Sequence, residues 1–183
     1  MSLPAVTFRP CTPDDLPLLA RWMAQPHVAR YWREDAELAA VEERYLPCLD
    51  GRDPTELFAL EADGAPVGLF QRYLVADNEE WATTLRGTGQ PDTDTAIGID
   101  YLIGEQPLTG RGLGTFAITA FTQLALERYP AANLLLVDVA QGNIASWRAL
   151  EKTGYVRCWA GELVSDDPSD EGPMYLYRFT SGR

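Results

Sequence analysis

One short segment restricts the fold more than any other, the run Gly110-Arg111-Gly112-Leu113-Gly114-Thr115 between a predicted strand and a predicted helix. Glycine lets the backbone approach a ligand closely, and the first N–H groups of a helix are unpaired and aligned with the helix dipole. Arg111 adds a positive charge beside them. The segment therefore predicts an anion-binding turn, and the alternative is a glycine-rich connection that binds nothing.

The spacing of these glycines separates three classes of phosphate ligand. A P-loop has the pattern GxxxxGK[ST], and no lysine follows the glycines here, which disfavours nucleotide hydrolysis. The dinucleotide-binding pattern GxGxxG also fails, because its third glycine is missing. A pyrophosphate such as that of coenzyme A remains compatible with the turn.

The hydrophobic pattern on either side of the turn predicts a mixture of strands and helices. Strands are predicted over residues 6–10, 56–62, 66–76, 96–103, 134–139, 155–164 and 174–180, with a hairpin turn at Asp63-Gly64. Helices are predicted over residues 12–23, 27–32, 35–46, 112–128 and 143–153. The helix over 112–128 is expected to bury Phe116, Ile118, Ala120, Phe121, Leu124 and Ala125. This order predicts one α/β domain over residues 1–183, built around a mixed sheet.

Residues 77–95 are predicted to form a loop, because they are acidic and contain Gly87, Gly89 and Pro91 with little periodicity. Long loops in compact domains often cover a substrate. Trp81 and the acids around it, Asp77 among them, favour that interpretation over a simple linker.

The charge of the chain limits its partners. The formal net charge of the 183 residues is −12. Nucleic acid and anionic membrane surfaces both require a basic face, so neither is an expected partner. A small cationic molecule is a better match, although the acidity alternatively serves only solubility. The longest apolar runs are too short to cross a bilayer, and no signal peptide is visible at the N-terminus.

The cysteines and the histidine indicate a compartment and disfavour a metal. Cys11, Cys48 and Cys158 form neither a CxxC pair nor an even-numbered disulfide framework, which is typical of a reducing cytoplasm. His27 is the only histidine, and we interpret it as structural or as a residue at the edge of a substrate site. One histidine without a cysteine cluster is a poor metal-binding set. We therefore expect a cytoplasmic protein that uses no metal.

A second segment, NIASWRALEKTGY, begins at Asn143 after another predicted strand. The two segments together resemble the motifs of the GNAT superfamily of N-acetyltransferases, its [QR]xxGxG pyrophosphate loop and its NxxAxxxYxKxGF segment. The resemblance spans most of the chain and implies a GNAT-type mixed β-sheet flanked by helices on both faces, with acetyl-coenzyme A as co-substrate. Two positions depart from the family. Thr109 replaces a glutamine or arginine, and Leu150 replaces a tyrosine that can protonate the leaving thiolate. Either Tyr155 or a water molecule is then the donor, or the thiolate leaves unassisted.

Several stretches outside these motifs are similar to aminoglycoside 6'-N-acetyltransferases and their siderophore-synthesising relatives. They are residues 26–32, 45–47, 98–104, 112–115 and 137–138. This resemblance implies that Asp100 is the catalytic base and that Asp138 and the loop of Trp81 lie on the substrate side. The residues expected to bind the acceptor are Trp32, Asp77, Trp81, Asp100 and Asp138.

The chemistry of amines supports the role of Asp100 independently. An alkylammonium has a pKa of about 10, so it must lose a proton before it attacks a thioester. A carboxylate on a splayed strand can attract the cation and then accept that proton, directly or through water. The alternative is that Asp100 only caps a loop or pairs with an arginine. The same kind of structural role is the alternative for Asp138. The alternative for Trp81 is a hydrophobic contact that only fixes the loop, and the alternative for Trp32 is a position in the core.

The resemblance also implies how the co-substrate is held during direct transfer in a ternary complex. Backbone groups of β-strand residues are expected to orient it, the glycine turn to bind its pyrophosphate and the asparagine to contact its pantetheine arm. The full expected set is Tyr101, Leu102, Ile103, Gly110, Arg111, Gly112, Leu113, Gly114, Thr115, Asn143 and Ser146.

The expected activity is N-acetylation of a primary amine on a small cationic acceptor, most similar to the aminoglycoside enzymes and hence to antibiotic resistance. One alternative is a siderophore-pathway acyltransferase that acts on an N6-hydroxylysine-type amine. Another is a catalytically silent module that binds coenzyme A. The protein is expected to be a monomer or a homodimer.

Overall fold

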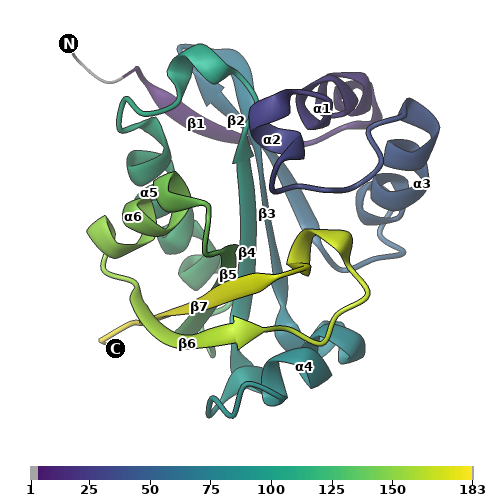
Figure 1. The fold of residues 1–183 in the computed structure, drawn as a ribbon. Coiled ribbons are helices and arrows are strands. Elements are labelled where there is room, and N and C mark those ends of the chain that lie inside the picture. The colour runs from purple at the N-terminus through teal and green to yellow at the C-terminus, as the bar shows by residue number, and fades with distance from the viewer. Residues whose placement is uncertain (1–3, 183) are drawn as a thin grey trace.

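The computed structural model describes residues 4–182 and contains a seven-stranded mixed sheet in the order β1-β2-β3-β4-β5-β7-β6. The strands are β1 (Val6–Pro10), β2 (Glu56–Ala62), β3 (Ala65–Leu74), β4 (Ile97–Ile103), β5 (Leu134–Ala140), β6 (Val156–Glu162) and β7 (Pro173–Thr180). The helices are α1 (Leu16–Met23), α2 (Pro26–Ala29), α3 (Leu38–Leu49), α4 (Glu79–Arg86), α5 (Leu113–Arg128) and α6 (Ile144–Lys152). Figure 1 shows α1, α2 and α3 on one side of the central strands and α5 and α6 on the other. The prediction of a mixed sheet with helices on both faces is confirmed.

Two local features follow directly from the sequence. The backbone N–H of Thr12 donates to the Asp15 carboxylate at 2.8 Å, as part of a capping box before α1. At the hairpin between β2 and β3, Asp63 and Gly64 have φ values of 51° and 79°, as a two-residue turn of this kind requires. The Asp63 carboxylate also accepts a hydrogen bond from the Ala5 N–H at 2.9 Å, which ties β1 to this turn.

The parallel strands β4 and β5 pair over only two positions, Ile97 with Leu135 and Gly98 with Leu136. Beyond these positions β4 pairs only with β3, and its other edge is free of strand partners. The same register, continued for two residues, places Asp100 level with Asp138 across the opening between the two strands. The backbone groups that line this opening are available to a ligand, since no neighbouring strand satisfies them.

The sheet face covered by α5 and α6 carries one continuous hydrophobic core, to which strands β1 to β5 and β7 contribute. Phe121 of α5 is fully buried there. Its ring lies 5.0 Å from those of Phe8 and Phe70 and 5.5 Å from that of Phe58, measured between centroids. These contacts fix α5 on the sheet and thereby fix the glycine turn at its N-terminus.

The opposite face carries two separate hydrophobic clusters. One packs α1 and α3 against β2, β3 and Leu102 of β4. The other packs α4 against Leu136 and neighbouring residues of β5 and β7. Asp100 lies two residues before Leu102, and Asp138 lies two residues after Leu136, so alternation directs both carboxylates to this face. They lie in the gap between the two clusters.

Residues 77–95 were predicted to form a loop. The structure corrects this prediction, because the segment contains α4. Asn78 caps this helix by accepting a hydrogen bond from the Trp81 N–H at 3.0 Å, and Glu79 occupies its first turn. The helix is only eight residues long, and its buried residues are Ala82 and Leu85. Two apolar positions in one short helix give too little periodicity to distinguish it from an acidic loop.

The buried side of α5 also differs from the prediction. Three of the six expected residues are fully buried, namely Ile118, Phe121 and Ala125. Phe116 and Leu124 are instead 45% and 36% exposed, and Ala120 is only partly buried. Apolar residues occur on more than one side of this helix, so the sequence pattern alone does not show which side is buried. No helix within residues 4–182 is both long enough and apolar enough to cross a membrane.

Candidate active site

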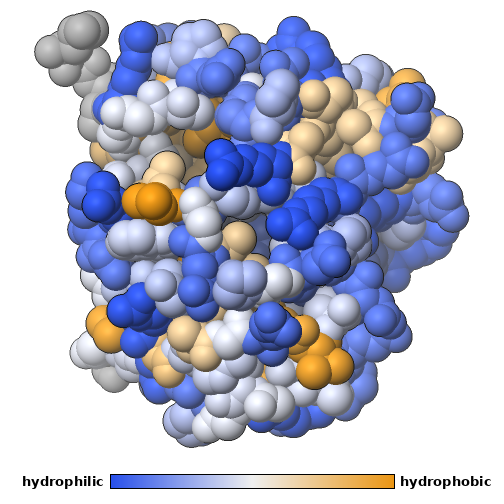
Figure 2. Space-filling model, viewed as in Figure 1, coloured by the Kyte–Doolittle hydropathy of each residue, from blue (hydrophilic) through white to orange (hydrophobic). Residues whose placement is uncertain are grey.

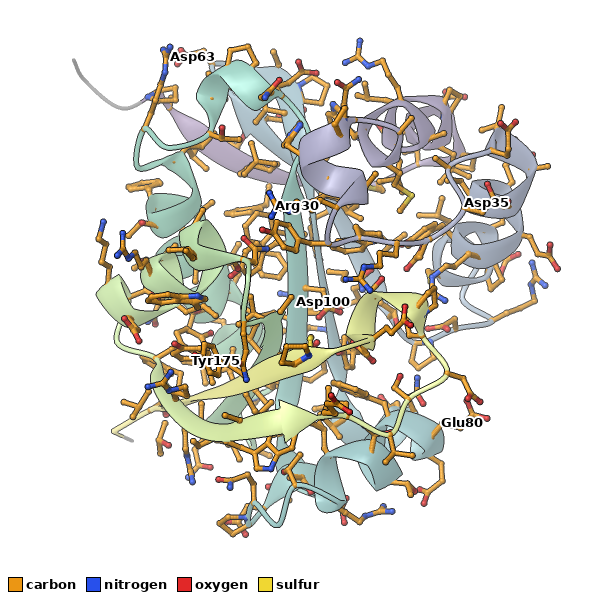
Figure 3. The ribbon with its side chains drawn as sticks, in the orientation of Figure 1. Arg30, Asp35, Asp63, Glu80, Asp100 and Tyr175 are labelled. Carbon is orange, nitrogen blue, oxygen red and sulfur yellow. The ribbon has the colours of Figure 1, made fainter. Side chains whose placement is uncertain are left out.

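Asp100 lies on β4 at the opening between β4 and β5, near the middle of the view in Figure 3. Its cross-strand partner Gln71 donates a hydrogen bond from Nε2 to Oδ2 at 2.7 Å. Burial raises the pKa of Asp100 to about 6, and the charge of Asp170 adds to this, while hydrogen bonding from Gln71 and Tyr73 acts in the opposite direction. A carboxylate that titrates near neutral pH can accept a proton from an amine and release it again, as a general base must.

Two further carboxylates lie close enough to Asp100 to interact with it. Asp138 comes from β5, and Asp170, which is 9% exposed, ends the short 3-10 turn before β7. Burial, together with the charges of Asp170 and Asp100, raises the pKa of Asp138 well above its usual value. Burial raises the pKa of Asp170 as well, and the nearby Asp167 contributes in the same direction. We call Asp100, Asp138 and Asp170 the acidic group.

No arginine or lysine among residues 4–182 forms an ion pair with a member of the acidic group. A buried charge without a partner is costly, so the acidic group favours a ligand that brings positive charge. Within the same residues, no three histidine, cysteine or acidic side chains are arranged to hold a metal ion. Figure 2 shows mainly hydrophilic side chains on this side of the molecule, around a depression near its middle.

The segment that carries Asp170 is held in place by the region between α2 and α3. The Arg33 N–H donates to Ser169 Oγ at 3.1 Å, and the Arg33 guanidinium donates to the carbonyl of Glu171, just after the turn, at 3.2 Å. Arg44 of α3 forms ion pairs with Glu34 at 2.9 Å and with Asp167 at 3.3 Å. These contacts join segments that are far apart in the sequence, and they fix the turn that presents Asp170.

The other residues expected to bind the acceptor lie in three different places. Trp81 packs against the α4 cluster together with Tyr73, and Trp32 packs against the cluster of α1 and α3. The two tryptophans thus belong to the two clusters that border the acidic group. Asp77 is exposed, and its charge acts on Tyr129 at the end of α5. The structure does not bring Asp77 to the acidic group, and its role stays a prediction.

The glycine turn has the geometry that an anion requires. Gly110 and Gly112 have φ values of 71° and 90°, in the left-handed region that favours glycine. No side chain caps α5, and the N–H of Phe116 is the first to bond back, to the Gly112 carbonyl at 3.1 Å. The N–H groups of residues 113–115 therefore point out of the helix end, beside the exposed Arg111. This set fits a pyrophosphate.

The backbone of β4 offers fewer groups to the opening than the sequence suggested. Gly68 packs so closely against the carbonyl of Leu102 that a Cβ would clash, so the backbone groups of Leu102 point to β3. By alternation, Tyr101 and Ile103 present theirs to the opening. The Ile103 carbonyl accepts a hydrogen bond from His27 Nε2 at 2.9 Å, which makes the histidine structural. Tyr101 is thus the residue of the three whose backbone is best placed to orient a ligand.

The start of α6 contributes polar groups to the same opening. Asn143 caps the helix, and its Oδ1 accepts a hydrogen bond from the Ser146 N–H at 3.3 Å. The Ser146 hydroxyl forms a 2.8 Å hydrogen bond with the hydroxyl of Tyr101. Asn143 therefore shapes the helix start, and its contact with a pantetheine arm stays a prediction. Thr109, which precedes the glycine turn, donates to the Gln106 carbonyl at 2.8 Å.

Tyr155 does not lie at the opening, which argues against it as a donor to a leaving thiolate. It is 2% exposed, and its hydroxyl lies 2.8 Å from Thr122 Oγ1. Thr122 in turn donates to the Ile118 carbonyl at 2.8 Å, so the proton of Tyr155 is engaged by Thr122. Leu150 is fully buried in the same core.

Sequence reasoning missed three residues of the site, Gln71, Tyr73 and Asp170. The first two alternate with Leu69 along β3, and the antiparallel register with β4 would have placed Gln71 opposite Asp100. Asp170 was not singled out within its acidic turn. It reaches the site only because β7 pairs with β5, an order that no local pattern encodes.

A family model described as "Acetyltransferase (GNAT) domain" matches residues 12–163, a stretch that contains the opening, the glycine turn and α6. The chain belongs to the GNAT acetyltransferase family. This acetyltransferase is 30% identical over 157 residues to the aminoglycoside N(6')-acetyltransferase type 1 of Klebsiella pneumoniae. The same values hold for the protein of that name from Serratia marcescens, and each alignment covers 84% of this chain and 75% of the relative.

Solved structures of AAC(6')-Ib resemble this GNAT acetyltransferase over nearly its whole length. The complex of that aminoglycoside acetyltransferase with coenzyme A has a TM-score of 0.79 and 27% identity, over 96% of this chain and 95% of that one. Its complex with paromomycin and acetyl-coenzyme A has a TM-score of 0.80 and 27% identity, over 96% and 93%. The resemblance inferred from the two sequence motifs is confirmed.

Proposed function

We propose that this chain is an acetyl-coenzyme A-dependent N-acetyltransferase that acetylates the 6'-amine of aminoglycosides. Its curated relatives at 30% identity carry that name, and the AAC(6')-Ib structures hold coenzyme A or acetyl-coenzyme A, in some cases with an aminoglycoside. The structure adds an acidic group that is largely buried, forms no ion pair with an arginine or lysine of residues 4–182 and borders the opening in the sheet. That group carries the proposal.

The electrostatics of the acidic group match a polycationic acceptor. An aminoglycoside carries several ammonium groups at neutral pH, because amines titrate well above it. A cation next to a carboxylate stabilises its charged form, so the acceptor would reverse the rise in pKa that burial produces at Asp100, Asp138 and Asp170. Binding and proton release are therefore coupled, and acceptor affinity increases as pH rises through the pKa of the acidic group.

Asp100 is the base in this scheme. Gln71 holds its Oδ2, and Tyr73 also donates a hydrogen bond to this carboxylate, so the base is fixed in place for the ammonium that is to react. With a pKa of about 6, Asp100 is ionised at neutral pH, so it can draw in the ammonium and accept its proton directly or through water. Asp138 and Asp170 hold neighbouring ammonium groups and so orient the reacting amine.

The other side of the opening holds the donor. Residues 113–115 bind its pyrophosphate through their free N–H groups, with Arg111 adding charge, and the Tyr101 backbone aligns the pantetheine arm beside β4. Bound acetyl-coenzyme A supplies the activated acetyl group. The chain contributes the alignment of amine and thioester, together with the removal of the amine proton.

A thiol-release assay with matched acceptors tests the proposal. Each pair consists of two aminoglycosides that differ only in an amine or a hydroxyl at the 6' position. We expect release of coenzyme A with the 6'-amine member alone, and a product whose acetyl group lies on that nitrogen. Equal turnover of both members would contradict the assignment of the 6'-amine.

The same assay separates the alternatives when polyamines, lysine derivatives and N6-hydroxylysine are included. Turnover of N6-hydroxylysine alone would favour the siderophore-pathway acyltransferase. Coenzyme A binding without turnover of any acceptor would favour the silent module. Expression in a susceptible bacterium then tests resistance, for which we expect a higher inhibitory concentration only for aminoglycosides with a 6'-amine.

A further inference from the structure

Acetyl transfer to an amine breaks the C–S bond of a thioester and leaves the electron pair on sulfur. Donors that are already in position stabilise such a developing anion most effectively. Asp100 cannot provide this donor, because it accepts the amine proton. Leu150 of α6 has no polar hydrogen, and the Tyr155 hydroxyl is engaged by Thr122 in the core. A donor that belongs to the protein must therefore be another group at the opening.

Tyr101 and Ser146 place two hydroxyl groups on the face opposite Asp100. Tyr101 follows Asp100 directly on β4, so the two side chains project from opposite faces of the strand. Its hydroxyl lies 2.8 Å from Ser146 Oγ, in the first turn of the helix that follows β5. The pair thus connects the two elements that border the opening. A group that lies between β4 and β5 has Asp100 on one side and the hydroxyl pair on the other.

Both members of the pair are held by their surroundings. The Tyr101 ring stacks on Phe70, with centroids 5.2 Å apart and an interplanar angle of 20°. The Ser146 backbone is fixed by the cap from Asn143. Neither residue is fully buried. The pair is therefore positioned before any ligand binds.

A count of protons distinguishes this pair from the one at Tyr155. Two hydroxyls in contact use one proton between them and keep a second for another acceptor. In the Tyr155–Thr122 pair the second proton goes to the Ile118 carbonyl. In the Tyr101–Ser146 pair the second hydroxyl proton has no acceptor within residues 4–182. Burial raises the pKa of Tyr101 above its usual value, so the phenol keeps its proton.

We propose that the Tyr101–Ser146 hydroxyl pair donates its free hydrogen bond to the sulfur of coenzyme A as the C–S bond breaks. The inference rests on the proposed acetyl transfer and assigns a role that Leu150 cannot fill. Asp100 first takes a proton from the ammonium and passes it to solvent. The N–C bond then forms, the attacking nitrogen gives its second proton to Asp100, and the C–S electron pair stays on sulfur as a hydrogen-bonded thiolate. The hydroxyls keep their protons, Asp100 returns its proton to solvent, and water protonates the thiolate after release.

The test is the pKa of the thiol of bound coenzyme A, followed by the ultraviolet absorbance of the thiolate without any acceptor. It is measured in the native protein, in Tyr101→Phe, in Ser146→Ala and in the double variant. A hydrogen bond to a charged group changes an equilibrium by about 10- to 100-fold, so the bound thiol should titrate roughly 1–2 pH units lower in the native protein than in the double variant. We expect kcat to fall by the same factor, and coenzyme A affinity at low pH, where the thiol is neutral, to change less than about twofold. The single variant with the larger effect identifies the hydroxyl that faces the sulfur.

Tyr155→Phe is the matched control, since it also removes a tyrosine hydroxyl on this side of the sheet. We expect it to leave the bound thiol pKa and kcat unchanged. An equal bound thiol pKa in the native protein and the double variant would overturn the proposal, even if turnover fell. A low thiol pKa that is lost in the double variant supports it even when no aminoglycoside is acetylated, and in that case the acceptor assignment alone fails.

Discussion

The two faces of the sheet use the same strands for different purposes. On the face of α5 and α6, large side chains such as Phe70 and Phe121 form one core without a break. On the other face the apolar side chains separate into two clusters, and the acidic group lies between them. Along β4 the difference depends on single positions, because Ile99 enters the continuous core while Asp100 faces the gap.

This difference teaches how the fold combines stability with chemistry. The continuous core fixes α5, and with it the anion-binding turn. The donor side of the site therefore rests on a well-packed apolar core. The gap between the two clusters holds carboxylates that form no ion pair within residues 4–182, so a bound cation should stabilise the acceptor side. Substitutions on the two faces should therefore have effects of different kinds.

The largest effect is expected for Asp100→Asn. Asparagine keeps the shape of the side chain and an oxygen that can accept from Gln71, but it cannot take the amine proton. General-base catalysis contributes about 10²- to 10⁴-fold, so kcat/KM in the thiol-release assay should fall by that factor. Coenzyme A affinity, measured by calorimetry, should remain within about twofold, because the residues that hold the donor lie on the other side of the opening.

Asp94→Asn is the control for this variant. Asp94 is an exposed acid that pairs with Arg86 at 2.9 Å, outside the acidic group, so its loss should leave kcat/KM unchanged. Turnover of Asp100→Asn within tenfold of the native protein would remove Asp100 from the role of base.

The comparison of the faces also explains what the sequence could predict. The glycine turn, the helix start at Asn143 and the position of Asp100 were visible because each depends on residues that are adjacent in the chain. Asp170 was missed because its place beside Asp138 depends on the pairing of β5 with β7. The prediction of the buried side of α5 was partly wrong because apolar residues lie on more than one side of this helix, so packing decides which are buried, and Phe116 is exposed.

The next effect concerns stability and should differ between the faces. Phe121→Ala removes a fully buried ring that contacts three others, which costs about 3–5 kcal/mol. In a chain of this size each kcal/mol lowers Tm by about 2–4 °C, so the loss should be on the order of 10 °C. Calorimetric unfolding measures it. The KM for the acceptor should not change at temperatures where the variant is folded.

Leu85→Ala in α4 is the matched truncation on the opposite face. Leu85 is equally buried but belongs to the smaller cluster, so the damage should remain local. Hydrogen exchange should accelerate in residues 79–86, and the acceptor KM should rise because Trp81 lies on the same helix. An equal loss of Tm in both variants, without a change in KM for Leu85→Ala, would contradict the division between the faces.

Asp138→Asn should weaken acceptor binding and stabilise the protein. Burial and neighbouring carboxylates raise the pKa of Asp138 in the folded protein, so in the pH range above the ordinary value of about 3.9 the folded state binds more protons than the unfolded state. The free energy of unfolding therefore falls as pH rises through that range. The asparagine variant lacks the titrating group, so its stability does not fall for this reason. At pH 7.5 its free energy of unfolding should be higher by on the order of 1–3 kcal/mol.

Thermal unfolding at several pH values measures this gain, which should shrink as the pH is lowered to 4 and below, where Asp138 becomes protonated in the unfolded state as well as in the folded state. The KM for a polycationic acceptor should rise by about tenfold, as expected for one lost interaction with a charged group. A variant that is less stable than the native protein at pH 7.5 would show that the Asp138 carboxylate is compensated in a way that the ion pairs do not reveal.

The smallest expected effect is a shift of the pH profile in two opposite directions. In the native protein kcat/KM should fall below an apparent pKa of about 6, because protonated Asp100 cannot act as a base. The charge of Asp170 raises the pKa of Asp100, so Asp170→Asn should move this acid limb to lower pH. Hydrogen bonding from Gln71 lowers the pKa of Asp100, so Gln71→Leu should move the limb to higher pH.

Each shift should be up to about one pH unit, since one neighbouring charge or hydrogen bond has an effect of that size. The opposite signs are the sharper result, because a change in folding or in acceptor affinity would move both profiles in the same direction. The acidic group titrates as a unit, so the measured values belong to the group as well as to Asp100. If both profiles moved in the same direction, or if Asp100→Asn kept the acid limb, the pH dependence of kcat/KM would not come from the acidic group.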